Sequence, residues 1–214
     1  MKLKKENILL YVVTDRTWLG QNKLRDQVEE IIKSGATLLQ VREKDLSFEE
    51  FVAEAKQIKN ITERYGIPLI INDRIDVAIA VDADGVHLGQ EDEDIKKAKE
   101  IFGADKIIGI SAHNVEEALK AQNNGADYIG VGAVFSTSTK KDANTVAYET
   151  LQDICRAVTL PIVAIGGITE DNILNLSGSG VDGVAVISAI FASENVGKAT
   201  DKMLGLAKKM ISGR

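Results

Sequence analysis

Two acidic segments of the chain each follow a short apolar run with the composition of a buried strand. Asn72-Asp73-Arg74 comes directly after 69–71, and Gln90-Glu91-Asp92 follows the next such run. If the two runs are strands of one parallel sheet, their carboxyl ends lie at the same edge, where such sheets bind ligands. Converging carboxylates there favour a hard cation, Mg²⁺ more than Zn²⁺. Alternatively, Asp73 caps the next helix, and Gln90-Glu91-Asp92 opens a solvated one.

Gln40, Arg42 and Lys44 alternate at the end of another predicted strand, over 37–41. Alternate residues of a strand point to the same side, so the three side chains are predicted to face one ligand. Arginine binds phosphate through two parallel hydrogen bonds and lysine binds it as a point charge, which suits a phosphate or pyrophosphate. The alternative is that Lys44 lies in a loop and is simply solvated.

Three later loops carry groups that suit an anion. The segment 135–141 is hydroxyl-rich and basic, which is typical of a lid or a phosphate clamp, with a flexible linker as the alternative. Gly166-Gly167 and Ile187-Ser188 each follow a predicted strand, and their backbone N–H groups could meet at one anion. Gly-Gly can also be a tight turn only.

The remaining residues of chemical interest favour structural roles. The two histidines, His87 and His113, suit core or rim positions better than a general base. Gly130-Val131-Gly132 lacks the third glycine of a dinucleotide-binding fingerprint, so we dismiss that match. The one cysteine, Cys155, cannot form an intramolecular disulfide, and one cysteine with two histidines cannot build an ordinary zinc site.

Composition predicts an ordinary globular protein. Of 214 residues, 44% are hydrophobic and 27% are charged, and the net charge is −6. A nucleic-acid partner would require a basic face, which this charge argues against. The apolar run at 8–13 is too short for a signal peptide or a membrane span, so we expect a cytoplasmic protein with no membrane partner.

Strand-like and helix-like segments alternate from end to end and would position these residues. Strands are predicted at 8–14, 37–41, 69–71, 85–88, 106–110, 128–131, 161–165 and 183–187. Helices are predicted at 23–33, 48–64, 75–80, 94–101, 115–123 and 148–157, then from 170, and finally up to about 210. Eight such units with near-continuous apolar strands predict an α/β fold, a single (β/α)₈ TIM barrel domain over 1–214.

Small residues followed by an acid or a threonine precede several of these strands. Examples are Ser34-Gly35-Ala36-Thr37 and Asn124-Gly125-Ala126-Asp127, with similar segments at 82–84, 102–105 and 180–182. Glycine can end a helix in the left-handed conformation, and a small residue then packs beneath the barrel. We interpret these turns as stabilising, on the face opposite to the ligand site.

Seven motifs, in order along nearly the whole chain, resemble those of thiamine-phosphate synthases: LLQVREK, LIINDR, DGVHLGQED, IGISAH, YIGVGAVFSTSTK, IVAIGGI and GVAVIS. That family consists of (β/α)₈ barrels. They join 4-amino-2-methyl-5-hydroxymethylpyrimidine diphosphate to 4-methyl-5-(2-phosphoethyl)thiazole and release pyrophosphate. The resemblance therefore implies a transferase that makes thiamine phosphate, with Mg²⁺ as cofactor and these two small molecules as partners. The resemblance does not decide whether the protein forms a homo-oligomer.

Carried over by position, the resemblance assigns three groups of residues. Those implied to bind the pyrimidine diphosphate are Gln40, Arg42, Lys44, Asn72, Ser111 and Lys140, of which Arg42, Lys44, Ser111 and Lys140 also act in catalysis. Asp73 and Asp92 would bind Mg²⁺. The thiazole phosphate would be bound by Thr137, Thr139, Gly167, Ile187 and Ser188. The chain departs from the family pattern at Lys141, often a proline, and at Ala147, often a glycine.

The implied mechanism is dissociative. Pyrophosphate leaves first, and the thiazole nitrogen then attacks the pyrimidine-methyl cation. Three rivals are a related thiazole tautomerase, which would need His113 as acid and base, a catalytically inactive regulator that binds thiamine phosphates, and a generic phosphate-binding barrel isomerase. The tautomerase has no use for the diphosphate-binding set, and the isomerase leaves the metal pair unexplained.

Overall fold

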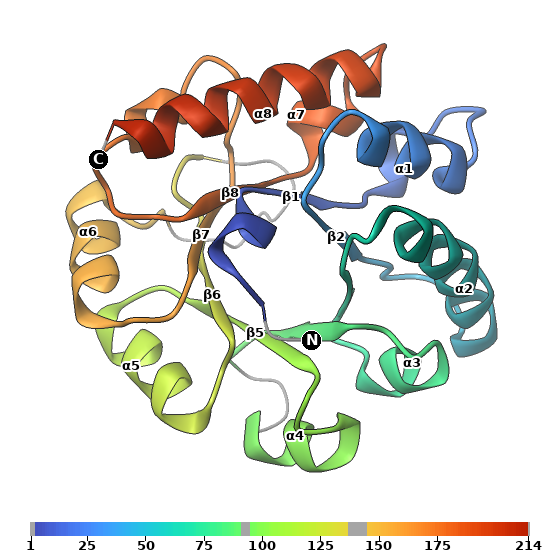
Figure 1. Ribbon diagram of the computed structural model, residues 1–214, viewed down its shortest axis with the longest axis horizontal. Helices are drawn as coiled ribbons and strands as arrows, with labels where there is room; N and C mark the ends of the chain where they lie inside the picture. Colours follow the sequence, from blue (N-terminus) through green and yellow to red (C-terminus); the bar gives the residue numbers. More distant parts are fainter. Residues whose placement is uncertain (1–2, 91–94, 137–144, 214) are drawn as a thin grey trace.

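The computed structural model describes residues 3–90, 95–136 and 145–213. Its strands close into a barrel in the order β1 to β8, and each strand pairs in parallel with the next. Helices surround this barrel (Figure 1). The strands are β1 (Leu10–Val13), β2 (Leu38–Val41), β3 (Leu69–Asn72), β4 (Gly85–Leu88), β5 (Ile107–Ala112), β6 (Tyr128–Gly132), β7 (Ile162–Ile165) and β8 (Gly183–Val186). The predicted (β/α)₈ barrel is confirmed.

The helices fall close to their predicted positions. They are α1 (Leu24–Lys33), α2 (Phe48–Tyr65), α3 (Ile75–Ala80), α4 (Ile95–Phe102), α5 (Val115–Asn124), α6 (Tyr148–Ala157), α7 (Ser188–Phe191) and α8 (Val196–Ser212). The structure also has three 3-10 turns: η1 (Lys5–Ile8) and η2 (Arg16–Trp18) come before α1, and η3 (Ile173–Leu176) comes between α6 and α7. The helix predicted from 170 is the short turn η3, and α7 was not predicted. Within the described ranges, no helix is long and apolar enough to cross a membrane.

Side chains fill the barrel on both sides of its wall. Outward-facing residues pack beneath the helices in one large apolar cluster. Inward-facing residues form a second cluster, which contains Ile8, Tyr11, Val13, Leu38, Ile70, Ile107, Tyr128, Val163 and Ala185. The barrel is therefore a packed core rather than a pore, as its diameter requires.

The N-terminal turn η1 closes one end of the barrel. The strand predicted at 8–14 begins only at Leu10, because Ile8 belongs to η1 and lies fully buried in the inner cluster. Figure 1 shows this segment, in dark blue, crossing the centre of the barrel. A Cβ on Gly183 would lie only 1.8 Å from the Ile8 carbonyl oxygen, so the close approach of η1 requires glycine there. A ligand must therefore enter from the opposite end.

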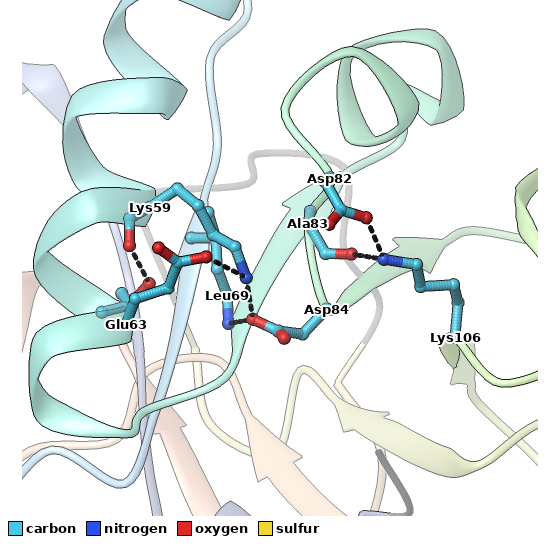
Figure 2. A network of polar contacts seen from close by, with 8 residues as sticks. Lys59, Glu63, Leu69, Asp82, Ala83, Asp84 and Lys106 are labelled. Carbon is cyan, nitrogen blue, oxygen red and sulfur yellow. Dashed lines mark hydrogen bonds and ion pairs between the residues drawn. The ribbon is translucent and has the colours of Figure 1, made fainter.

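At this closed end, the residues just before β2, β4, β6 and β8 accept hydrogen bonds from the backbone at the starts of β1, β3, β5 and β7. Backbone N–H groups donate to side chains in four places: Leu10 to Thr37 (2.9 Å), Leu69 to Asp84 (2.8 Å), Ile108 to Asp127 (2.9 Å) and Ile162 to Asp182 (3.0 Å). Lysines pair with the aspartates, as Lys59 does with Asp84 (2.9 Å). Figure 2 shows Asp84 between Lys59 and Leu69. These turns are stabilising, as predicted from their sequence.

Asp84→Asn should destabilise the fold by about 1–3 kcal/mol, because it removes the charge that faces the Lys59 ammonium. Lys59 is only 9% exposed. The matched control is Asp82→Asn, because Asp82 pairs with Lys106 in the same turn but its side chain is 88% exposed. The control should cost less than about 0.5 kcal/mol. Urea denaturation measures both values, and equal losses would contradict this account.

Candidate functional site

Three of the predicted ligand-binding residues lie at the carboxyl ends of strands and face the barrel interior. Leu38, Ile70 and Ile107 belong to the inner cluster. Because strand residues alternate, Gln40, Asn72 and Ser111 lie on the same inner side, above that cluster. Gln40 is 4% exposed, and the other two are half-buried. The structure thus places all three residues on the inner side of the barrel at its open end.

Arg42 follows β2, and the first loop fixes its backbone. The N–H of Arg42 donates to the buried Thr14 hydroxyl (3.0 Å), and the Thr14 N–H donates to the Gln40 carbonyl oxygen (2.9 Å). The Arg42 side chain is half-buried, whereas Lys44 is exposed. Solvation of Lys44 therefore remains an alternative to phosphate binding.

Glu43, between these two cations, belongs to a separate ion cluster. Arg16 donates to Glu43 (2.8 Å) and also binds Glu54. The Glu43 side chain is only 4% exposed. Its burial, together with a hydrogen bond to Glu54 and the charge of that group, outweighs the attraction of Arg16 and raises the pKa of Glu43 to about 7. This cluster ties the first loop to the loop that carries Arg42 and Lys44.

Asp73 turns the chain at the end of β3. It has a positive φ of 61°, which is uncommon outside glycine but which aspartate tolerates. Its N–H donates to the His87 carbonyl oxygen (2.9 Å), and its carboxylate accepts a hydrogen bond from Asn72 Nδ2 (2.6 Å). The alternative role as a helix cap is wrong, because α3 has Arg74 at its N-cap and no side-chain cap bond.

Four predicted site residues, Asp92, Thr137, Thr139 and Lys140, lie outside the described residues, as does Lys141. Of the predicted metal pair, the structure therefore places Asp73 only. Its carboxylate is exposed at the open end. A carboxylate at that position fits a hard cation such as Mg²⁺, which takes few protein ligands and keeps several waters. The magnesium site stays a prediction.

The loops after β6 and β7 pack against each other. Gly166 and Gly167 have φ values of 96° and 66°. A Cβ on Gly167 would lie 2.4 Å from the Ser136 carbonyl oxygen, and Phe135 N–H donates to the Gly166 carbonyl oxygen (3.0 Å). Gly167 is thus required for this close approach. The close approach is consistent with both earlier alternatives for Gly166-Gly167, a phosphate site and a tight turn only.

The loop after β8 leads directly into α7. Ile187 is the N-cap of that short helix, and Ser188 is its first residue. Both residues are half-buried. The two therefore occupy the start of a short extra helix after the eighth strand, which is a frequent phosphate position in this fold.

The two histidines occupy the positions that their sequence context indicates. His87 lies in β4 inside the barrel, where Nε2 is 3.0 Å from Ser111 Oγ. His113 lies on the rim. Its Nδ1 and its backbone N–H both contact one Glu117 carboxylate oxygen, at 2.9 and 2.8 Å, at the start of α5.

Sequence reasoning missed two buried tyrosines that connect these residues. Gln40 Nε2 donates to the Tyr11 hydroxyl (2.6 Å), which lies 2.8 Å from the Tyr128 hydroxyl. Two glycines were the available signal. A Cβ on Gly109 would lie 2.1 Å from the Tyr128 ring, and one on Gly130 would lie 3.1 Å from the His87 ring. Mid-strand glycine often marks such a close approach.

A family model described as thiamine monophosphate synthase matches residues 10–190 of the chain. The chain belongs to the thiamine monophosphate synthase family. It is 51% identical over 205 residues to the thiamine-phosphate synthase of Clostridium tetani (strain Massachusetts / E88), covering 96% of this chain and 98% of that protein. It is 50% identical over 207 residues to the thiamine-phosphate synthase of Clostridium acetobutylicum (strain ATCC 824), covering 97% and 98%.

Solved structures agree with this membership of the thiamine monophosphate synthase family. Thiamine phosphate pyrophosphorylase from Pyrococcus furiosus superposes with a TM-score of 0.89 at 42% identity, covering 97% of this chain and 98% of that one. A 3-hexulose-6-phosphate synthase has a TM-score of 0.63 at 16% identity, covering 93% and 99%, and shows likeness of fold alone. The family resemblance of the sequence motifs is confirmed.

Replacement of Glu43 by glutamine should change how stability depends on pH. The pKa of Glu43 is higher in the folded state than in the unfolded state, so as the pH rises the unfolded state loses this proton first. The wild type therefore loses stability as the pH rises from about 4.5 to about 7. Glutamine removes this loss. Relative to wild type, Glu43→Gln should gain about 1–2 kcal/mol between pH 5 and pH 8.

Urea denaturation at the two pH values measures this gain. The matched control is Glu49→Gln, an exposed glutamate near the start of α2, which should change with pH as the wild type does. If wild type and Glu43→Gln respond equally to pH, the raised pKa of Glu43 is refuted.

Gly167→Ala should destabilise the fold more than Gly66→Ala. Both glycines have a φ of 66°, so both variants carry the same backbone penalty of about 1 kcal/mol. A Cβ on Gly66 meets nothing within 4 Å, whereas one on Gly167 meets Ser136 and Phe135. That overpacking should add about 1–3 kcal/mol, measurable by thermal denaturation. Equal losses would show that the two loops can separate without cost.

Proposed function

We propose that the chain is a thiamine-phosphate synthase that joins the pyrimidine and thiazole substrates named above and releases pyrophosphate. One observation carries the proposal. Gln40, Asn72 and Ser111 lie on the inner side of the barrel at its open end, and the half-buried Arg42 follows Gln40 at the end of β2. Relatives named thiamine-phosphate synthase, at about half identity over nearly the whole chain, support the same reaction.

The proposed roles follow from the chemistry of each group. Arg42, Lys44 and Lys140 would neutralise the diphosphate, because cations are stabilising where negative charge develops. Gln40, Asn72 and Ser111 would orient the pyrimidine diphosphate. The thiazole phosphate would lie between the 137–139 segment, Gly167 and the start of α7, where backbone N–H groups can bind an anion.

Asp73 and Asp92 would hold Mg²⁺, whose charge, when bound, stabilises the departing diphosphate. Asn72 contributes by holding the Asp73 carboxylate through its side-chain amide (2.6 Å). The positive φ of Asp73 sets the direction of that side chain. This chain's own residues thus fix the carboxylate before any ligand binds, which lowers the cost of binding.

In the proposed reaction, the bond between the pyrimidine methylene carbon and the diphosphate oxygen breaks first. Its electron pair leaves with the oxygen, and the methylene becomes a cation stabilised by the ring amino group. The thiazole nitrogen then donates its lone pair and forms the new carbon–nitrogen bond. No protein nucleophile is needed, so positioning and electrostatic stabilisation supply the catalysis.

The proposed partners are the two small-molecule substrates. Both carry phosphate groups, and charged groups are costly to transfer into the hydrocarbon core of a membrane. The substrates therefore have to be made and used in the same compartment, which we propose is the cytoplasm.

The thiazole tautomerase remains the rival with a testable residue. It would use His113 for proton transfer, but that ring lies at the rim, held by Glu117 at the start of α5. A regulator that binds thiamine phosphate without reacting would need the same pocket but no release of pyrophosphate. The tautomerase would therefore form a different product from the synthase, and the regulator would form none.

The test is pyrophosphate release from the purified protein with both substrates, with and without Mg²⁺. We expect release only when both substrates and the metal are present. Asp73→Asn should lower the rate by about 100-fold or more, because it removes a charge that holds the metal. Asp92→Ala should behave in the same way.

The matched control is Asp76→Asn, three residues along the chain, where the carboxylate pairs with Arg74 on the surface (2.7 Å). It should leave the rate unchanged. Binding of thiamine phosphate without pyrophosphate release would refute the synthase and favour the regulator. Isomerisation of a thiazole carboxylate phosphate without pyrophosphate would favour the tautomerase.

A further inference from the structure

We infer that Tyr11, Tyr128 and His87 are positioning residues. They form a hydrogen-bonded relay inside the barrel that joins Gln40 to Ser111 and directs the Ser111 hydroxyl hydrogen toward the ligand. The relay itself is a property of the protein without ligands. Its effect on the reaction rests on the proposed function.

The relay crosses the barrel from β2 to β5. Gln40 Nε2 donates to the Tyr11 hydroxyl (2.6 Å), which lies 2.8 Å from the Tyr128 hydroxyl. The Tyr128 hydroxyl lies 2.9 Å from His87 Nδ1, and His87 Nε2 lies 3.0 Å from Ser111 Oγ. Both tyrosines are buried, with exposures of 1% and 0%. Each end of the relay is a residue predicted to bind the pyrimidine substrate.

The number of hydrogens fixes the direction of every bond. Tyr11 accepts a hydrogen bond from Gln40, and among the bonds described its own hydrogen has only the Tyr128 oxygen to go to. If Tyr128 donated to Tyr11 instead, the Tyr11 hydrogen would be buried without an acceptor, which is unfavourable. Tyr11 therefore donates to Tyr128.

The Tyr128 hydroxyl hydrogen determines the protonation state of His87. The Tyr128 hydrogen goes to His87 Nδ1, which must then be the ring nitrogen without a hydrogen. The neutral ring carries its hydrogen on Nε2 and donates it to Ser111 Oγ. Because Ser111 accepts this bond, its own hydrogen points elsewhere and can be donated to a ligand oxygen. At the other end of the relay, the side-chain carbonyl oxygen of Gln40 can still accept a hydrogen bond from a ligand.

The surroundings keep this order intact. Burial raises the pKa of Tyr11 well above the ordinary value, and burial and the neighbouring Tyr11 raise the pKa of Tyr128, so both phenols keep their hydrogens. The two rings meet edge to face, with centroids 5.9 Å apart at 75°. Gly109 and Gly130 leave room for the Tyr128 and His87 rings. A rigid relay of this kind orients ligand-binding groups before the substrate arrives.

The first experiment measures the ring nitrogens of His87 in protein carrying ¹⁵N-labelled histidine, without substrates. The chain has only two histidines, and the rim residue His113 serves as the reference. We expect the neutral form with the hydrogen on Nε2. In Tyr128→Phe, which keeps the ring and removes two hydrogen bonds, that preference should be lost. In Tyr11→Phe it should persist, because Tyr128 still donates to Nδ1.

The second experiment measures pyrophosphate release by the same variants. Tyr128→Phe should lower kcat by about 10-fold or more, as loss of an orienting group usually does. The KM for the thiazole phosphate, which binds elsewhere, should not change. Ile107→Val is the control for core damage, because Ile107 lies in the same inner cluster at the start of β5, away from the open end, and takes no part in the relay. It should lower the melting temperature at unchanged kcat.

The outcomes separate the relay from the proposed function. Wild-type His87 with its hydrogen on Nδ1, or with both nitrogens protonated, would overturn the relay. Tyr128→Phe with the kcat of Ile107→Val would overturn its positioning role. A wild type that shows the expected nitrogen signals but never releases pyrophosphate would support the relay and overturn the proposed function.

Discussion

Two phenol hydroxyls buried inside a closed barrel, those of Tyr11 and Tyr128, constrain the site above them. A buried hydroxyl without a partner is unfavourable, so each must find its hydrogen bonds within the barrel. The partners are Gln40 and His87, and His87 in turn reaches Ser111. The need to satisfy the core therefore determines where ligand-binding side chains lie, and packing and chemistry are coupled through one set of bonds.

The two ends of the barrel divide stability from chemistry. At the closed end, η1 fills the interior, and Thr37, Asp84, Asp127 and Asp182 hold the starts of alternate strands. Because these bonds fix the strands from below, the loops at the open end can differ in sequence without loss of the fold. Polar residues can accumulate there, where a ligand can satisfy them.

The sequence predicted the barrel well because its signals are local. Apolar runs and capping residues mark the elements, and alternation alone placed Gln40 on the inner side. The relay could not be predicted in this way, since its central bond joins residues 117 positions apart in the chain. The helix-cap alternative for Asp73 was wrong because the turn places Arg74 at the cap. The first strand was predicted too long because Ile8 is as apolar as a strand residue, although it ends η1.

A crystal structure of the protein with Mg²⁺, pyrophosphate and thiamine phosphate tests the central claim most directly. The account predicts pyrophosphate against Arg42, the metal on Asp73, and the pyrimidine ring over the inner cluster between Gln40 and Ser111. The distances of the relay should be unchanged, because it is formed before the ligand binds. Products bound outside the open end, or a relay broken by their binding, would contradict the account.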